Sequence, residues 1–253
     1  MTNNLEKKNV DLQTLADSFG TEISDVKKAC EKQLDNMDTG YTVYTGLQRE
    51  KLIIEIIKSI DSDKQIIGAP ERTNVWNDGW NENLNLLKNN NYQLENLIPK
   101  YIIKNKPLRF MGEYILPNEQ NFEHHYFNIY RSWLFEKYFS NFDSIYDIGC
   151  GSSYNLVELC KQFPKKKIYG FDFVKSSVDI VNEISKFYNF NAEGKIFDII
   201  NPDLDIHLDE NSLVFTAGVI EQVAGKFEKF IDYILQMKPK LVVNSEPIYE
   251  LYD

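Results

Sequence analysis

The stretch Tyr146-Asp147-Ile148-Gly149-Cys150-Gly151-Ser152-Ser153-Tyr154-Asn155 decides the fold of this 253-residue chain. An apolar run that we expect to form a strand leads into a loop with two glycines, and the loop leads directly into a helix. Gly149 and Gly151 can adopt backbone angles closed to other residues and let a ligand lie against bare backbone. The next helix offers N–H groups without intrahelical partners to an anionic group. The segment therefore predicts a cofactor site at the end of a strand.

The spacing of the glycines narrows the choice of cofactor. A dinucleotide-binding loop needs a third glycine three positions after the second, where helix and strand pack around a pyrophosphate. Tyr154 occupies that position, which argues against NAD or FAD. A phosphate-binding P-loop is also excluded, because no Gly-Lys-Ser/Thr follows.

Beyond residue 141 short apolar runs alternate with amphipathic helices, which is typical of a parallel sheet built from βαβ units. We expect strands at 144–148, 167–171, 192–197, 212–217 and 240–244, helices at 155–163, 176–188 and 227–237, and an irregular crossover around 201–209. This pattern predicts an α/β, Rossmann-like parallel sheet with helices on both faces.

The residues before this region have a helical pattern from Asp11 to about residue 60, with Asp11 and Thr21 as N-caps, Gly20 as a stop and a capping box at Thr45. We expect a loop at 61–75, a polar helix from Trp76 to about 88, loosely ordered Asn-rich stretches at 81–95, an extended segment at 108–117 and a joining helix at 119–139. The predicted domains are a mainly helical extension, 1–118, which would serve as an acceptor-binding cap, and a cofactor-binding domain, 119–253.

Two acids follow predicted strands. In an open α/β sheet ligands bind outside the carboxyl ends of the strands. Asp172 lies 172 − 151 = 21 positions after Gly151, roughly where a carboxylate reaches ribose hydroxyls, and Asp198 follows the third strand. The alternative is that each is only a helix cap or turn residue.

Asp147-Ile-Gly149-Cys150-Gly151-Ser-Ser153 resembles motif I of the class I S-adenosylmethionine-dependent methyltransferases, which reads acid, any residue, Gly, any residue, Gly, any residue, Gly. Ser153 replaces the last glycine, and serine is small and can cap a helix. The resemblance covers about residues 120–247. It implies that these five named residues surround S-adenosyl-L-methionine.

The same resemblance assigns roles at the other strand ends. It implies that Asp198 accepts a hydrogen bond from the adenine amino group, that apolar neighbours such as Phe173 and Ile199 sandwich the ring, and that Ala217 lies on the methionine side. Glu221 is the candidate base or orienting group, although it could simply begin the next helix. Many relatives carry Glu-His where this chain has Glu221-Gln222, so proton abstraction has no imidazole here.

Other polar and aromatic residues could contribute. His124 or His125 on the joining helix could face the acceptor, and Arg131 could hold the cofactor's carboxylate, although surface exposure and a helix-face ion pair are the alternatives. Trp76 and Trp80 could close over a planar or sugar-like acceptor, or simply pack in a core. The histidines and cysteines show no metal-ligand spacing, so we predict no metal.

Composition restricts the partners. The net charge of −10 gives nucleic acids and anionic membrane surfaces little attraction, so a small molecule or saccharide is the expected acceptor. Three unpatterned cysteines, 43% hydrophobic content and no apolar signal or spanning segment indicate a soluble, cytoplasmic protein without a membrane partner.

The sequence ends soon after the fifth predicted strand, whereas class I methyltransferases usually continue with two more strands. We therefore expect a truncated chain whose methyl transfer is weak or absent and whose exposed sheet edge could support a homo-oligomer. The leading function is S-adenosylmethionine-dependent methyl transfer. The alternatives are a non-catalytic cofactor-binding or scaffold protein and a nicotinamide-dependent oxidoreductase.

Overall fold

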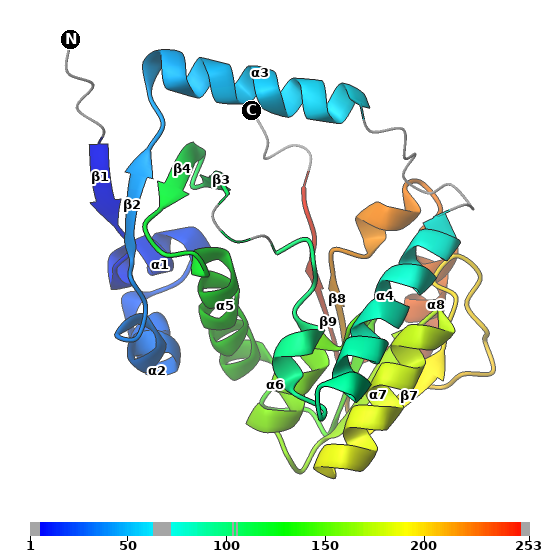
Figure 1. The fold of residues 1–253 in the computed structure, drawn as a ribbon. Helices are drawn as coiled ribbons and strands as arrows, with labels where there is room; N and C mark the ends of the chain where they lie inside the picture. The colour runs from blue at the N-terminus through cyan, green and yellow to red at the C-terminus, as the bar shows by residue number, and fades with distance from the viewer. Residues whose placement is uncertain (1–5, 63–71, 103, 105, 249–253) are drawn as a thin grey trace. The chain divides into compact units, whose positions relative to one another are not determined.

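The computed structural model describes residues 6–62, 72–102, 104 and 106–248 (Figure 1). The chain forms two compact units, one from Met1–Lys64 with Lys100–Tyr138 and the other from Gln65–Pro99 with Phe139–Asp253. This division does not coincide with the sequence-based boundary between residues 118 and 119. The helix before residue 99 belongs with the parallel sheet, and the joining helix belongs with the N-terminal residues.

The first unit combines helices with an antiparallel sheet. Its strands are β1 (Glu6–Asn9), β2 (Gly40–Val43), β3 (Leu108–Phe110) and β4 (Glu113–Pro117), in the order β1-β2-β4-β3. Its helices are α1 (Leu12–Phe19), α2 (Ile23–Leu34), α3 (Gly46–Ser62) and α5 (Phe122–Tyr138). Aromatic side chains fill its core, where Phe19 of α1 stacks on Trp133 of α5 with ring centroids 4.9 Å apart.

The N-terminal prediction is correct for the caps of α1 and for the extended segment at 108–117, which forms β3 and β4, but it missed β1 and β2. Asp11 caps α1 by accepting a hydrogen bond from the Thr14 N–H at 2.8 Å, and Gly20 ends the helix in the left-handed conformation. Thr21 is not the N-cap of α2, because that position falls on Glu22. The pattern from residue 11 to 60 is interrupted by β2, which is only four residues long and pairs with β1 and β4, distant in sequence.

The second unit contains a five-stranded parallel sheet in the order β7-β6-β5-β8-β9. The strands are β5 (Ser144–Ile148), β6 (Lys167–Asp172), β7 (Ala192–Ile196), β8 (Ser212–Ala217) and β9 (Leu241–Ser245). The helical elements are α4 (Arg72–Asn89), η1 (Leu94–Leu97), α6 (Tyr154–Gln162), α7 (Lys175–Tyr188), η2 (Ile220–Val223) and α8 (Glu228–Met237). In chain order the strands run 3-2-1-4-5, so the chain reverses direction across the sheet at the central strand, β5.

Helices cover both faces of this sheet. On one face Gly170 of β6 lies close to Val181 of α7 and Leu156 of α6. On the other face Tyr146 and Phe171 pack in a buried cluster with Phe230 and Tyr233 of α8. All five residues of β5 are buried, as expected for a central parallel strand. The predicted α/β, Rossmann-like fold is confirmed.

From β5 onward the predicted strands and helices match the observed ones to within one residue at each end, and residues 197–211 form the expected irregular crossover, whereas α4 begins four residues before the predicted start at Trp76. The Asn-rich stretch is more ordered than expected, because residues 81–89 belong to α4, where the Asn83 side chain is buried and donates to the Asn96 carbonyl at 2.6 Å. Part of the predicted loop at 61–75 lies outside the described residues, and its last residues, 72–75, begin α4.

Candidate functional site

A cavity of about 420 Å³ lies at the carboxyl ends of the parallel strands of the second unit. Sites for small molecules typically measure about 300–1,000 Å³ and occur at this edge of open α/β sheets. The lining comes from α4 (Arg72, Thr73, Trp76, Trp80), the end of β5 (Ile148, Gly149, Gly151), the end of β6 (Asp172, Phe173), the end of β7 (Ile196, Phe197, Asp198, Ile199, Ile200) and the residues after β8 (Gly218, Val219, Gln222, Val223, Lys226).

The glycine loop after β5 turns sharply at the cavity wall. Gly149 and Gly151 have φ angles of +70° and +52°, a region that favours glycine. A Cβ atom added to Gly149 would lie 2.6 Å from a methyl group of Val219, and one added to Gly151 would lie 2.9 Å from the Trp80 ring. The two glycines are therefore required both by the turn and by the close approach of neighbouring side chains.

The N–H groups of this loop bond within the protein. Gly149 donates to the Phe171 carbonyl at 2.6 Å, and Gly151 donates to the Asp172 carboxylate at 2.9 Å. Ser153 stands at the N-cap position of α6 but makes no side-chain cap, contrary to the expectation from its small size. Its φ of +64° differs from the extended conformation in which an N-cap side chain reaches the helix N–H groups.

Asp172 is the buried acid at the tip of β6. One carboxylate oxygen accepts from the Gly151 N–H and the other accepts from the Val174 N–H at 3.1 Å. Burial raises the pKa of this carboxyl group, and the hydrogen bonds from Val174 and Gly151 oppose that shift. Each oxygen can accept a further bond, so the carboxylate can still meet a ligand hydroxyl at the cavity.

Asp198 has a similar local geometry at the end of β7. Its Oδ1 accepts from the Ile200 N–H at 2.8 Å, and its Oδ2 accepts from the Asn201 side-chain amide at 3.3 Å. The side chain is partly exposed and lines the cavity. Asp172 and Asp198 thus bring two carboxylates to one cavity from neighbouring strand ends.

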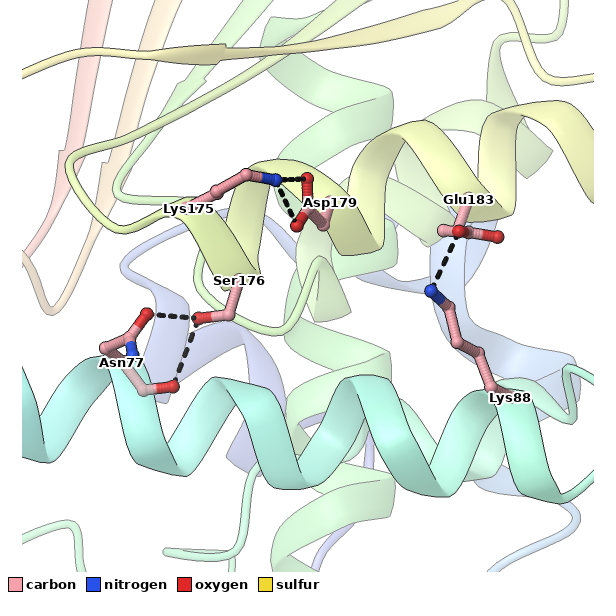
Figure 2. A network of polar contacts seen from close by, with 6 residues as sticks. All are labelled: Asn77, Lys88, Lys175, Ser176, Asp179 and Glu183. Carbon is pink, nitrogen blue, oxygen red and sulfur yellow. Dashed lines mark hydrogen bonds and ion pairs between the residues drawn. The ribbon is translucent and has the colours of Figure 1, made fainter.

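Helix α4 forms the wall opposite the strand ends and is attached along the length of α7. At one end Ser176 donates to the carbonyl and side-chain oxygens of Asn77 at 3.2 and 3.3 Å, and at the other end Lys88 and Glu183 form an ion pair at 2.9 Å (Figure 2). Tyr92, just beyond α4, also donates to Glu183 at 2.8 Å. Contacts at both ends hold α4 against the sheet domain.

The cavity face of α4 carries stacked aromatic rings and a cation. The rings of Trp76 and Trp80 lie 5.7 Å apart and are inclined by 18°, and the Arg72 guanidinium lies 5.2 Å from the Trp76 ring centre. Arg72 also donates to the Gln222 side-chain oxygen at 2.9 Å. The amide nitrogen of Gln222 in turn donates to Glu221 at 2.9 Å.

Glu246, just beyond β9, fixes the segment after β8. Its Oε2 accepts from the N–H groups of Val219 and Ile220 at 2.8 and 3.2 Å, and burial raises its pKa. Because Val219 is the residue that packs against Gly149, Glu246 indirectly positions one wall of the cavity. The sequence did not single out Glu246, although it follows a strand as Asp172 and Asp198 do.

The structure brings some of the sequence-predicted site residues together and places others elsewhere. The residues that line the cavity are Gly149, Gly151, Asp172, Phe173, Asp198 and Ile199. Outside the lining lie the buried Asp147, Cys150 and Ser153, the partly buried Ala217 and the exposed Glu221. Arg131, His124 and His125 belong to α5 in the first unit, whereas the lining comes from the second unit.

Sequence reasoning missed Arg72 and Thr73 as lining residues. Arg72 and Thr73 fell in a predicted loop, and no periodic pattern connects α4 with the strand ends. The tryptophans were the available signal, since two large aromatic residues four positions apart lie on the same face of a helix.

The described residues contain no cluster of three or more His, Cys, Asp or Glu side chains with metal-site geometry. Nor does any helix within the described ranges have the length and apolar character needed to cross a membrane.

No protein-family model and no curated protein matches the chain. Solved structures that resemble it include PKMT2 from Rickettsia typhi in complex with AdoHcy, at 25% identity over 38% of this chain and 18% of that chain, with a TM-score of 0.33. The plantazolicin methyltransferase BpumL in complex with SAH is similar at 23% identity over 46% of this chain and 44% of that chain, with a TM-score of 0.34. The cyclase SpnF matches at 13% identity over 43% and 40%, with a TM-score of 0.37.

The matched region spans less than half the length of each of these three proteins. Independently of them, the order and direction of the five strands define the second unit as a Rossmann-like α/β domain with a small-molecule cavity at its strand ends.

Proposed function

We propose that the second unit binds S-adenosyl-L-methionine and that the chain transfers its methyl group to a small-molecule or saccharide acceptor. One observation carries the proposal: a single cavity combines the glycine loop after β5 with two carboxylates, Asp172 and Asp198, from the ends of the next two strands. A nucleoside carries hydroxyl and amino donors, which two carboxylates at separate points can accept.

The residues present fit an adenosyl group. Asp172 would accept from ribose hydroxyls, because a carboxylate offers about four acceptor sites and the N–H groups of Gly151 and Val174 occupy two of them. Asp198 would accept from the adenine amino group, with Phe173 and Ile199 as apolar surfaces beside the ring. The Val219 and Trp80 side chains would flank the group near the glycines.

The bound sulfonium would supply an electrophilic methyl group, so the contribution of the protein is to align the acceptor and exclude water. Glu221 is exposed and bonded to Gln222, outside the cavity lining. The proposed catalysis therefore relies on alignment of the acceptor with the methyl group, and it assigns Glu221 no role as a base.

Calorimetric titration with S-adenosylhomocysteine tests the binding step. Asp198→Ala should weaken binding by about tenfold or more, because a hydrogen bond to a charged group contributes about 1.5–3 kcal/mol. Asp203→Ala is a matched control, since Asp203 accepts from the N–H two residues on at 3.0 Å, as Asp198 does, but lies outside the lining. Equal affinities of the two variants, or no binding by the unsubstituted chain, would refute the assignment.

The position of Glu221 also favours a second function, binding of the same cofactor without catalysis. Both functions predict binding of S-adenosylhomocysteine. Only the first predicts methylated product when S-adenosylmethionine is supplied with panels of small-molecule and saccharide acceptors, so product detection by mass spectrometry separates them.

A further inference from the structure

Arg72 presents a guanidinium group to the cavity with few partners. Within the described part of the chain it makes one hydrogen bond, to the neutral side chain of Gln222, and its Nε–H is buried without an acceptor. A guanidinium carries five N–H donors. A buried donor without an acceptor is destabilising, and more so when the group is charged. Among the described residues, the Arg72 guanidinium therefore has N–H donors without an acceptor.

The missing acceptor is not a carboxylate from the described residues. Acidic residues are plentiful in the sequence, with 38 Asp and Glu against 28 Lys and Arg. The acid linked to Arg72 through Gln222 is Glu221, and it accepts a hydrogen bond from the Gln222 amide nitrogen rather than from the guanidinium. The Gln222 side-chain amide lies between Glu221 and Arg72: its nitrogen donates to Glu221, and its oxygen accepts from the guanidinium. The positive charge thus remains available to the cavity.

Two contacts fix the orientation of the guanidinium. It lies over the Trp76 ring at 5.2 Å, and Gln222 holds one of its terminal nitrogens at 2.9 Å. Because α4 is attached to α7 at both ends, this geometry is set before any ligand arrives. An oriented planar fork next to an aromatic ring matches the planar, two-oxygen geometry of a carboxylate.

We propose that Arg72, held by Trp76 and oriented by the Glu221–Gln222 pair, binds a carboxylate group of a ligand in this cavity. The carboxylate could belong to the amino-acid end of the cofactor or to the methyl acceptor, and in the first case the inference rests on the proposed function. Arg72 then takes the role that the sequence suggested for Arg131.

Three probes separate the two sources by calorimetry. S-adenosylhomocysteine carries the amino-acid carboxylate, 5′-methylthioadenosine has the same nucleoside without it, and benzoate is a planar carboxylate that stands for an acceptor. The variants are Arg72→Gln, Arg72→Lys, which keeps the charge but loses the fork, and the control Arg49→Gln, whose guanidinium packs over Tyr114 in the first unit.

For a cofactor carboxylate, Arg72→Gln should weaken S-adenosylhomocysteine binding by about tenfold or more and change 5′-methylthioadenosine binding less than about twofold. For an acceptor carboxylate, both nucleosides should bind normally, and benzoate should bind to the S-adenosylhomocysteine complex of the unsubstituted chain but not to that of Arg72→Gln. Arg72→Lys should fall between, and Arg49→Gln should change nothing.

Equal weakening of both nucleosides by Arg72→Gln would overturn the inference, since it would indicate damage to the wall. Unchanged affinities for all three probes would also overturn it. If the unsubstituted chain binds neither nucleoside, the proposed function fails, and benzoate titration of the free protein then decides this inference alone: binding that depends on Arg72 supports it, and no binding refutes it.

Discussion

The contact between Gly149 and Val219 gives the sharpest test of how the cavity is built. In Gly149→Ala the new methyl group would lie 2.6 and 2.7 Å from the two Val219 methyl groups, at a residue whose φ is +70°. Gly218→Ala is a matched control in the same unit, because its φ is +64° and the nearest atom to the added methyl group is 3.7 Å away. The two variants share the backbone strain and differ in the clash.

The magnitudes follow from these two effects. An alanine in the left-handed region costs about 1–2 kcal/mol, which applies to both variants. Overpacking costs a further 1–3 kcal/mol or so, which applies to Gly149→Ala alone. We therefore expect Gly149→Ala to lower the free energy of unfolding by about 2–5 kcal/mol and Gly218→Ala by about 1–2 kcal/mol.

Urea unfolding followed by circular dichroism measures both values. A third variant, Gly149→Ala with Val219→Ala, removes the clashing methyl groups and should be less destabilised than the sum of the two single substitutions by about 1–3 kcal/mol. The reasoning is refuted if the two glycine variants lose equal stability or if the double variant shows simple additivity.

Three further outcomes are expected. Asp172→Ala removes the acceptor of the Gly151 and Val174 N–H groups, so urea unfolding should show a loss of about 1–3 kcal/mol for each group; a total loss below about 1 kcal/mol would contradict it. Burial raises the pKa of Glu246, so the folded chain keeps this proton to higher pH than the unfolded chain does. The contribution of Glu246 to stability should thus fall as pH rises from the ordinary carboxyl pKa through the raised pKa of the folded state. The free energy of unfolding of the unsubstituted chain, measured relative to that of Glu246→Gln, should decline over the same pH range, and a pH-independent difference would contradict this. Lys88→Met breaks an ion pair whose side chains are 42% and 33% exposed, so the loss should be only about 0.2–1 kcal/mol and should disappear near 1 M salt; a larger or salt-independent loss would mean that Lys88 acts through packing.

The sheet of the second unit could be predicted because each signal is local. An apolar run, a turn and an amphipathic helix repeat along the chain, and parallel strands buried on both faces read as continuous apolar segments. β5 and β8 were predicted to the residue, since polar or glycine residues end both runs. Gly149 and Gly151 were also readable, because the turn after β5 requires positive φ angles.

The short strand β2 of the first sheet and the position of α4 beside the strand ends could not be predicted in this way. β2 is four residues long, and only its partners β1 and β4, far away in sequence, make it a strand. The cavity face of α4 is similar: Arg72 meets Gln222 across 150 residues, and no spacing rule connects them. Helix α4 contains six Asn residues and Gly79, which have poor helix propensity, so its position and much of its stability depend on tertiary contacts such as those with α7.

The acids at the strand ends show why a residue pattern by itself leaves function open. Asp172, Asp198 and Asp203 each accept a hydrogen bond from the N–H two residues on, so each is a turn residue in the ordinary sense. The turn role and the ligand role are therefore not alternatives. Local bonding uses one acceptor site of a carboxylate and fixes its direction, and the surroundings then decide whether the remaining sites meet a ligand. Asp172 and Asp198 line a cavity and Asp203 does not, which makes the comparison of Asp198→Ala with Asp203→Ala a test of the surroundings and not of the residue type.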